Sequence, residues 1–137
     1  MGLVYTKITL KNALDVGKEH EGLIDEQKIR QTTVQAMVDT GAGTLVINEE
    51  ILETLGLEIK GKRYAELADG TMQEYQVTAP VDIHWEGRVT SCRALVLPAS
   101  NDVLLGAIPL EDMDLIIDPA RQRLTGAHGD EVLCMVK

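Results

Sequence analysis

Residues 36–47, AMVDTGAGTLVI, set one acidic residue, Asp39, in a turn of small residues between two apolar runs. Aspartate is rare inside strands, and glycine interrupts them. We therefore expect Asp39 to follow the end of a strand, with its carboxylate held by a rigid loop that contains Thr40 and Gly41. An ordinary Asx-type turn after a strand would produce the same pattern, so this stretch alone leaves both interpretations open.

The composition predicts one folded domain over residues 1–137, because the chain is long enough to bury its own core and 45% of it is hydrophobic. Phe is absent and aromatic residues make up only 3%, so the core must be built from Val, Ile, Leu, Met and Ala. The net charge of −9 argues against nucleic acid and anionic membranes as partners, since no basic patch is available to neutralise phosphates. No apolar run approaches the length of a membrane span.

The cysteines and histidines predict neither a disulfide framework nor a metal site. Cys92 and Cys134 are too few and too far apart for a framework, and the N-terminus does not read as a signal peptide. Free thiols in a reducing cytoplasm are therefore expected. The three histidines show no metal-ligand spacing, among themselves or with the cysteines, so we expect no metal and no cofactor.

The first half of the chain reads as strands with one short helix. Residues 3–10 and 32–38 are rich in β-branched residues and predict two strands, the second leading into Asp39. The polar residues 11–31 predict a long solvated connection or mobile loop, with room for a strand extension on either side. Residues 44–47 predict a short strand, and the helix that follows is capped by Asn48 and stopped by Gly56.

Two hairpins follow in the sequence. Residues 64–68 and 71–77 flank Asp69-Gly70, a pair that favours a type I′ turn because both of its positions need positive φ. Residues 80–85 and 89–97 form a second pair joined through residues 86–88, and the alternation along 80–85 predicts a half-buried strand.

The last third begins with two leucines before a glycine. Residues 103–106, which include Leu105 and Gly106, predict a strand that ends where another backbone can come close. Residues 107–113 predict a short helix with proline in its first turn. Residues 115–117, a turn at Asp118-Pro119 and a return through Leu124 follow, and residues 132–136 predict a last strand.

The order of these features resembles the retropepsin-like aspartic peptidases. The shared features are Asp-Thr-Gly-Ala between apolar strands, then a hairpin, then Leu-Leu-Gly and a short helix, and they cover residues 3–124. The likeness is greatest to the small prokaryotic members of that group. It implies an all-β fold, a closed retropepsin-like β-barrel with one or two short helices.

The resemblance also implies a role for each site residue. Asp39 becomes the catalytic carboxylate, Thr40 braces the loop against a partner copy, and Gly41 lets the backbone approach the carboxylate. The strand that ends in Leu105 and Gly106 passes beside this loop. Substrate contacts are implied for Ala42 and for the tip of a flexible flap hairpin, at Asp69, Gly70 and Thr71.

An aspartic endopeptidase needs two carboxylates around one water, and they share one proton because two like charges at that distance do not ionise together. This chain has one Asp-Thr-Gly, so the resemblance implies a homodimer that takes Asp39 from each chain and cleaves a peptide or protein. Retroviral members carry an acidic residue soon after the motif and an arginine after the second glycine. Gly43-Thr44 and Ala107 stand there instead, which leaves the mode of dimerisation open.

Two other functions stay open at this level. A binding or dimerisation domain that kept the fold and lost turnover would have no chemical reason to retain Asp39-Thr40-Gly41. An enzyme that uses Asp39 as a covalent nucleophile is weakly supported, because position 41 is Gly where an Asp-x-Asp phosphatase pattern needs its second Asp. The sequence names neither the substrate nor its cleavage site.

Overall fold

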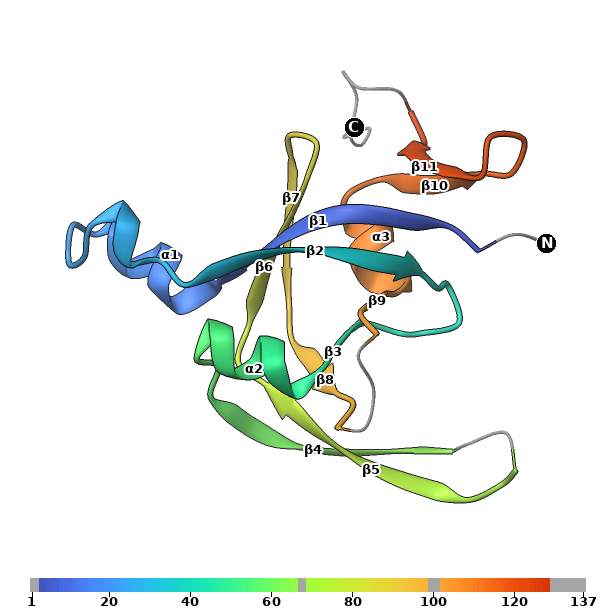
Figure 1. Ribbon diagram of the computed structural model, residues 1–137, viewed down its shortest axis with the longest axis horizontal. Coiled ribbons are helices and arrows are strands. Elements are labelled where there is room, and N and C mark those ends of the chain that lie inside the picture. Colours follow the sequence, from blue (N-terminus) through green and yellow to red (C-terminus); the bar gives the residue numbers. More distant parts are fainter. Residues whose placement is uncertain (1–2, 67–68, 99–101, 129–137) are drawn as a thin grey trace, which may run out of the picture.

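The computed structural model describes residues 3–66, 69–98 and 102–128 (Figure 1). Strands dominate, and the helices between them are short. In chain order the elements are β1 (Tyr5–Asn12), α1 (Ala13–His20), the 3-10 turn η1 (Glu26–Lys28), β2 (Gln31–Val38), β3 (Leu45–Ile47), α2 (Glu49–Leu55), β4 (Ile59–Glu66), β5 (Met72–Thr78), β6 (Val81–Trp85), β7 (Arg88–Cys92), β8 (Ala94–Val96), β9 (Leu104–Leu105), α3 (Ala107–Asp112), β10 (Leu115–Asp118) and β11 (Arg123–Gly126).

Nine of these strands form one sheet in the order β4-β5-β8-β3-β9-β2-β1-β6-β7, and β10 pairs separately with β11. The mostly β fold predicted from the sequence is confirmed. The closed barrel is not confirmed, because β4 and β7 stand at the two open ends of this order in the described part of the chain. The same part contains three short α-helices, one more than the sequence predicted.

The middle of the sheet positions the Asp39 loop. Strand β9 lies between β2 and β3, parallel to the first and antiparallel to the second. Leu105 is paired with Val38 on one side and with Leu45 on the other. The two ends of the loop between β2 and β3 are therefore fixed by the same residue of β9.

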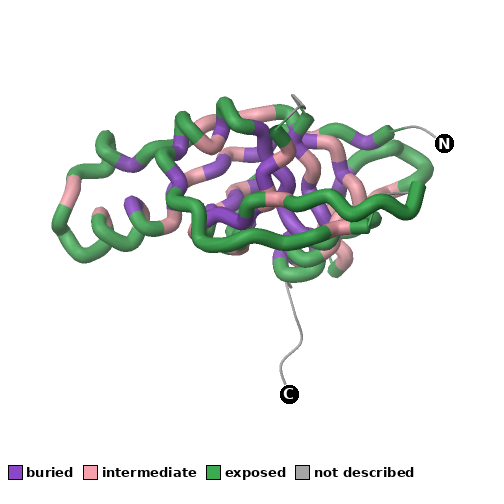
Figure 2. The backbone as a smooth tube through the Cα atoms, turned by 90° about the horizontal axis from the view of Figure 1, so that it is seen from below, coloured by how far each residue is buried: buried purple, intermediate pink, exposed green. Residues whose placement is uncertain are grey.

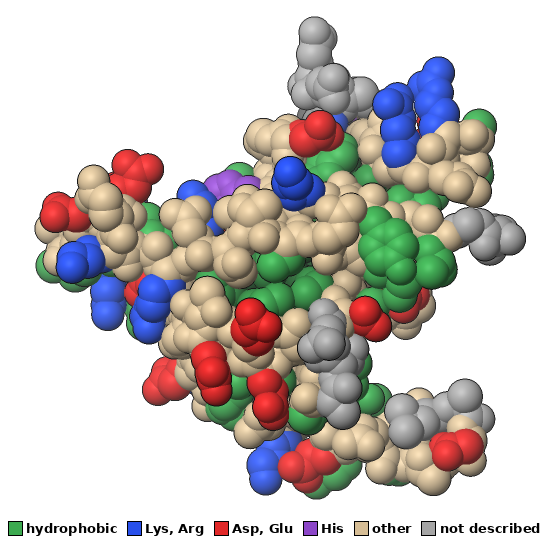
Figure 3. All heavy atoms as spheres, viewed as in Figure 1, with side chains coloured by type: hydrophobic (Ala, Val, Ile, Leu, Met, Phe, Trp, Pro, Cys, Tyr) green, Lys and Arg blue, Asp and Glu red, His purple; other side chains and the backbone are tan. Residues whose placement is uncertain are grey.

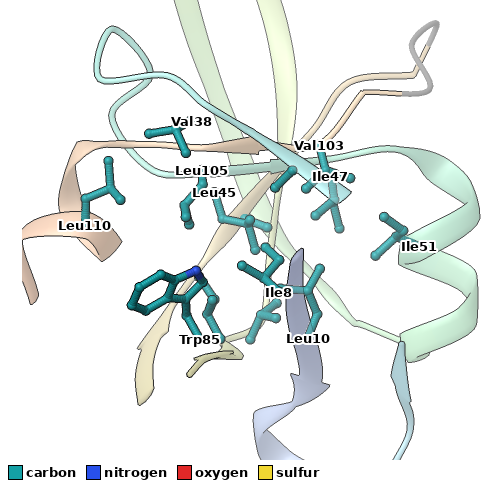
Figure 4. Close-up of a cluster of buried hydrophobic side chains, with 14 of the residues drawn as sticks. Ile8, Leu10, Val38, Leu45, Ile47, Ile51, Trp85, Val103, Leu105 and Leu110 are labelled. Atoms are coloured by element: carbon teal, nitrogen blue, oxygen red, sulfur yellow. The ribbon is translucent and has the colours of Figure 1, made fainter. Parts of the chain in front are cut away.

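The core is largely aliphatic, as the composition predicts, but Trp85 also belongs to it (Figure 4), which the sequence analysis did not expect. Its fully buried side chains include Ile8, Leu10, Ile47 and Leu105, and they lie together in Figure 4. Figure 2 shows buried residues in the centre of the molecule and exposed residues along most of the β4–β5 hairpin. The hairpin thus gains little from core packing beyond its base, where Val77 is buried.

The prediction of a long loop over residues 11–31 is wrong for its first part, which forms α1. Asn12 caps this helix by accepting a hydrogen bond from the amide of Asp15, at 3.1 Å. Asp15 is buried and binds Arg30, which lies just before β2. This contact joins residues far apart in the sequence, so local polarity gave no sign of it. The extension of both flanking strands into the segment is confirmed, since β1 runs to Asn12 and β2 begins at Gln31.

The prediction of a type I′ turn at Asp69-Gly70 is also wrong, although the hairpin itself is confirmed. The register that pairs Glu66 with Met72 leaves an odd number of residues between the strands, so a two-residue turn at Asp69-Gly70 does not fit, although Gly70 itself has positive φ. The tight turn lies instead between β6 and β7. There Glu86 and Gly87 both have positive φ, and Trp85 pairs directly with Arg88.

Two further predictions concern the ends of elements. Asn48 caps α2 through a 2.9 Å hydrogen bond from the amide of Ile51, and α2 ends before Gly56, so this helix is confirmed. The strand predicted over residues 132–136, together with Cys134, lies outside the described residues. None of the helices in the described ranges has the length and apolar character needed to cross a membrane.

Candidate active site

Asp39 directly follows the last residue of β2 and is half-buried. Its backbone amide donates to the carbonyl of Leu105 at 3.0 Å. The loop that begins here lies on the right in Figure 1, the same side to which the β4–β5 hairpin extends, and α1 lies at the opposite end of the molecule. The carboxylate is therefore carried by the first position after a firmly paired strand.

The loop closes tightly around this carboxylate. The amide of Gly41 donates to Asp39 Oδ1 at 2.9 Å, and the amide of Ala42 donates to the Asp39 carbonyl at 3.1 Å. A Cβ on residue 41 would stand 3.1 Å from Oδ1, closer than side chains normally come, so glycine suits this position. Thr40 is exposed at the turn. The carboxylate thus has a fixed orientation and an open side.

The beginning of α3 supports the second half of the loop. The amide of Ala107 donates to the carbonyl of Ala42 at 2.9 Å, and the amide of Ile108 donates to that of Gly43 at 3.1 Å. These two donors come from the first turn of a helix, where amides have no partner within the helix. Gly106 makes this approach possible, because a Cβ there would collide with the backbone of residues 42 and 44.

Thr44 ties the loop to another part of the sheet. Its hydroxyl donates to the carbonyl of Arg93 at 2.8 Å, just before β8 begins. Sequence analysis assigned no task to this hydroxyl, and no local pattern reveals it, because Arg93 reaches it through the pairing of β3 with β8. Burial raises the pKa of the neighbouring Cys92 thiol, so this cysteine stays protonated and is a poor nucleophile at neutral pH.

An apolar hollow of about 380 Å³ adjoins the loop at Thr40. Its walls come from α3 and β10, and they include Leu110, Leu115 and Ile116. Ile116 is 51% exposed. Thr40 of the loop therefore borders an apolar surface that includes an exposed isoleucine.

The hairpin residues predicted to contact substrate lie at the end of the β4–β5 hairpin. Thr71 donates to Asp69 Oδ1 from its amide at 3.0 Å and from its hydroxyl at 2.6 Å. The hydroxyl, and after it the amide, lower the pKa of Asp69. Among the described residues no hydrogen bond joins Asp69, Gly70 or Thr71 to the Asp39 loop. The single chain therefore brings together residues 39–42, 105 and 106, and it leaves 69–71 apart from them.

The described residues contain no group of three His, Cys, Asp or Glu side chains that could hold a metal ion. The side chains of the loop offer one carboxylate, on Asp39, and two hydroxyls, of which that of Thr40 is exposed and that of Thr44 is bound to the Arg93 carbonyl.

Solved structures similar to this chain are retropepsin-like. EIAV protease in complex with an inhibitor is 22% identical, with a TM-score of 0.54, over 81% of this chain and 88% of that one. The retroviral protease-like domain of Ddi1 from Leishmania major is 17% identical, with a TM-score of 0.57, over 96% of this chain and 91% of that one. At these identities the likeness establishes the fold alone.

A search of curated proteins gives no match. A family model does match, over residues 26–112, which include the Asp39 loop, the β4–β5 hairpin and all of α3. The retropepsin-like assignment made from the sequence is confirmed by this match and by the two structures. The chain belongs to the family described as gag-polyprotein putative aspartyl protease.

Proposed function

We propose that this protein is an aspartic endopeptidase that works as a homodimer, with Asp39 of each chain in one shared site. The observation that carries the proposal is the Asp39 loop. Its carboxylate is oriented by the Gly41 amide, and the backbone around it is bound by Leu105 and by the first turn of α3. A carboxylate that is already oriented needs no reorganisation when the reaction takes place.

The dimer follows from the number of carboxylates. The chain contains one Asp-Thr-Gly, and Asp69-Gly70-Thr71 is no substitute because it lies at the end of a hairpin, without an apolar strand leading into it. A two-fold axis beside Thr40 would bring two Asp39 carboxylates together. The exposed Thr40 and the apolar hollow next to it both favour a second copy at this place.

The two carboxylates would then divide the chemistry. The ionised Asp39 takes a proton from the water as its oxygen attacks the scissile carbonyl carbon, and the protonated Asp39 donates a hydrogen bond to the carbonyl oxygen. The tetrahedral intermediate collapses when the C–N bond breaks and the leaving nitrogen receives a proton from the pair. The products are one new carboxyl group and one new amino group.

The β4–β5 hairpin serves as the flap in this proposal. It extends on the side of the molecule that carries the Asp39 loop, and most of its residues are exposed (Figures 1 and 2). A hairpin with so little packing can move at low cost, and closure over a bound peptide would exclude water from the site. Asp69, Gly70 and Thr71 would form its tip.

The test is turnover of a degenerate peptide pool by the wild type and by Asp39→Asn. Asn is nearly isosteric with Asp but cannot supply an ionisable pair, so we expect cleavage to disappear while the fold and the dimer remain. Asp25→Asn is the matched control, because it makes the same chemical change beside η1, at the end of the molecule opposite the loop (Figure 1).

Equal turnover by Asp39→Asn and the wild type would exclude the paired-aspartate reaction. No turnover by either protein, with an intact dimer, would favour the alternative of a catalytically silent binding or dimerisation domain.

The location that we propose for the protein is the cytoplasm, whose reducing conditions would keep Cys92 a free thiol.

A further inference from the structure

A second, smaller hollow, of about 160 Å³, adjoins the Asp39 loop at Thr44. Thr44 of the loop and Ile108 of α3 form one wall. Arg63 of β4 and Arg93, which precedes β8, line the hollow from the sheet. This hollow, which we call the arginine pocket, thus joins the base of the hairpin to the loop that carries Asp39.

Strand register directs Arg63 into this pocket. Gly61 pairs with Val77 and Arg63 with Tyr75, while Val77 also pairs with Leu95 of β8. Side chains alternate along a strand, so Arg63 lies on the same face as Gly61 and next to Val77. Val77 and Leu95 both line the pocket, which agrees with this face.

Arg93 is positioned through its backbone. The Thr44 hydroxyl holds its carbonyl at 2.8 Å, and the next residue, Ala94, starts β8. Arg63 and Arg93 are both exposed. Neither makes an ion pair with any residue in the described ranges.

The charge of the residues that line the pocket is opposite in sign to the net charge of the protein. The chain carries a net charge of −9, and Figure 3 shows acidic side chains spread over much of one face. At the pocket the only acidic group whose charge acts on Cys92 is Asp112, which adds to the effect of burial on the thiol's pKa. The described residues that line the pocket thus include two arginines and no acidic residue, and Thr44, Cys92 and apolar residues complete the lining.

We propose that the arginine pocket binds an acidic side chain of the peptide substrate, and that Arg63 and Arg93 are the residues that select it. A guanidinium donates two parallel hydrogen bonds to a carboxylate, which fixes both the charge and the geometry of the ligand. The exposed Ile108 offers an apolar surface for the methylene groups of a glutamate. This inference rests on the proposed peptidase function and adds the substrate class.

The two-fold symmetry of the proposed dimer sharpens the expectation. Each chain contributes one arginine pocket, so the site would have one on either side of the scissile bond. A preference for acidic residues should therefore appear at a pair of substrate positions, placed symmetrically about the cleaved bond, rather than at one.

The test scans glutamate through the positions around the scissile bond of one cleaved peptide, with glutamine at the same position as the neutral reference. We expect kcat/KM to favour Glu over Gln by about 10-fold at the two symmetric positions, the effect of a charged hydrogen bond. Arg63→Gln and Arg93→Gln should each reduce this ratio towards one, because each should slow the Glu peptides more than the Gln peptides. Lys62→Gln is the control, because Lys62 neighbours Arg63 on β4 and instead pairs with Glu74.

The outcomes separate this inference from the proposed function. Asp39-dependent cleavage with equal kcat/KM for Glu and Gln peptides would overturn the acidic preference and leave the peptidase standing. Equal slowing of Glu and Gln peptides by both arginine variants would assign these residues to general structure and also overturn it. If no peptide is cleaved in an Asp39-dependent way, the proposed function fails, and the arginine pocket has no substrate to select.

Discussion

Gly106 lies so close to Thr44 that no side chain fits between them. A Cβ on Gly106 would stand 2.8 Å from the Thr44 nitrogen and 2.6 Å from the Ala42 carbonyl oxygen, and it would also collide with the Thr44 carbonyl. All of these obstacles are backbone atoms, which cannot rotate away as a long side chain can. The contact therefore holds the start of α3 against the Asp39 loop and excludes any side chain at position 106.

The first prediction is that Gly106→Ala destabilises the protein and distorts the loop. We expect the free energy of unfolding to fall by about 1–3 kcal/mol, as at other overpacked sites. Denaturant titration measures this change. Gly43→Ala is the control in the same loop, because nothing lies within 4 Å of a Cβ there. Equal stability of the two variants would contradict the close contact.

The second prediction is that specific activity falls when the protein is diluted. The proposed site needs a carboxylate from each chain, so a monomer has no complete site. Sedimentation and peptide turnover measured over the same dilution series decide this. Constant specific activity in a sample shown to be monomeric would exclude the shared site.

The third prediction locates the dimer contact. Ile116→Asp places a charge beside the apolar hollow next to Thr40, and we expect it to weaken the dimer and lower activity in parallel. Val89→Asp is matched to it, because Val89 is also β-branched, also lies in a strand and is also 51% exposed. Val89 belongs to β7, at one end of the nine-stranded sheet. Equal loss in both variants would mean that the contact lies elsewhere.

The fourth prediction concerns the hairpin. Gly70 has a φ of 85° and open space around it, so Gly70→Val strains the backbone without causing a collision. We expect turnover to fall more than the free energy of unfolding, because the strained end of the flap closes poorly. Gly70→Asn should retain more activity, since Asn tolerates positive φ. Proportional loss of stability and activity would make the hairpin a scaffold only.

The fifth prediction concerns the contact that holds α1. Arg30 donates to Asp15 from its amide at 3.0 Å, from Nε at 2.8 Å and from Nη2 at 2.9 Å. The guanidinium hydrogen bonds outweigh the effect of burial and lower the pKa of Asp15. A carboxyl with a lowered pKa stabilises the fold above its unfolded-state pKa and loses that effect as the pH falls through its folded value.

Asp15→Asn should therefore cost about 1–3 kcal/mol near neutral pH, nearer the lower value because Arg30 is half exposed. The difference from the wild type should shrink below about pH 4, as followed by thermal unfolding. Glu58→Gln is the control, since Glu58 and Lys60 form an exposed pair and no change in unfolding is expected. A difference that stays constant down to low pH would mean that the charge of Asp15 is not what matters.

The features predicted well from the sequence are those that depend on neighbours in the chain. Alternation along β6, the capping residue Asn48 and the two leucines before Gly106 each act over a few residues, and each is found in the structure. The Asp39 loop belongs with them, because a strand, a carboxylate and two glycines follow one another directly. The family model matches the stretch that contains this loop.

The features that the sequence missed depend on residues brought together from a distance. Helix α1 depends on a buried carboxylate and an arginine at the other end of a polar segment. Arg88 looked like part of a turn, yet it is buried and donates to the carbonyls of Met113 and Asp114 after α3. Such buried polar residues follow no periodic pattern in the sequence, so their structural role is seen only from the hydrogen bonds that they form in the folded protein.

The sequence by itself therefore determined the retropepsin-like assignment and the place of Asp39, because both follow from short patterns in which each residue restrains the next. Only the tertiary structure decided that Thr44 and α3 support the loop, that the hairpin turn is longer than two residues and that two arginines line one pocket next to Thr44. The reason is physical. Hydrogen bonds and charges act through space, and the sheet brings together side chains that the chain keeps apart.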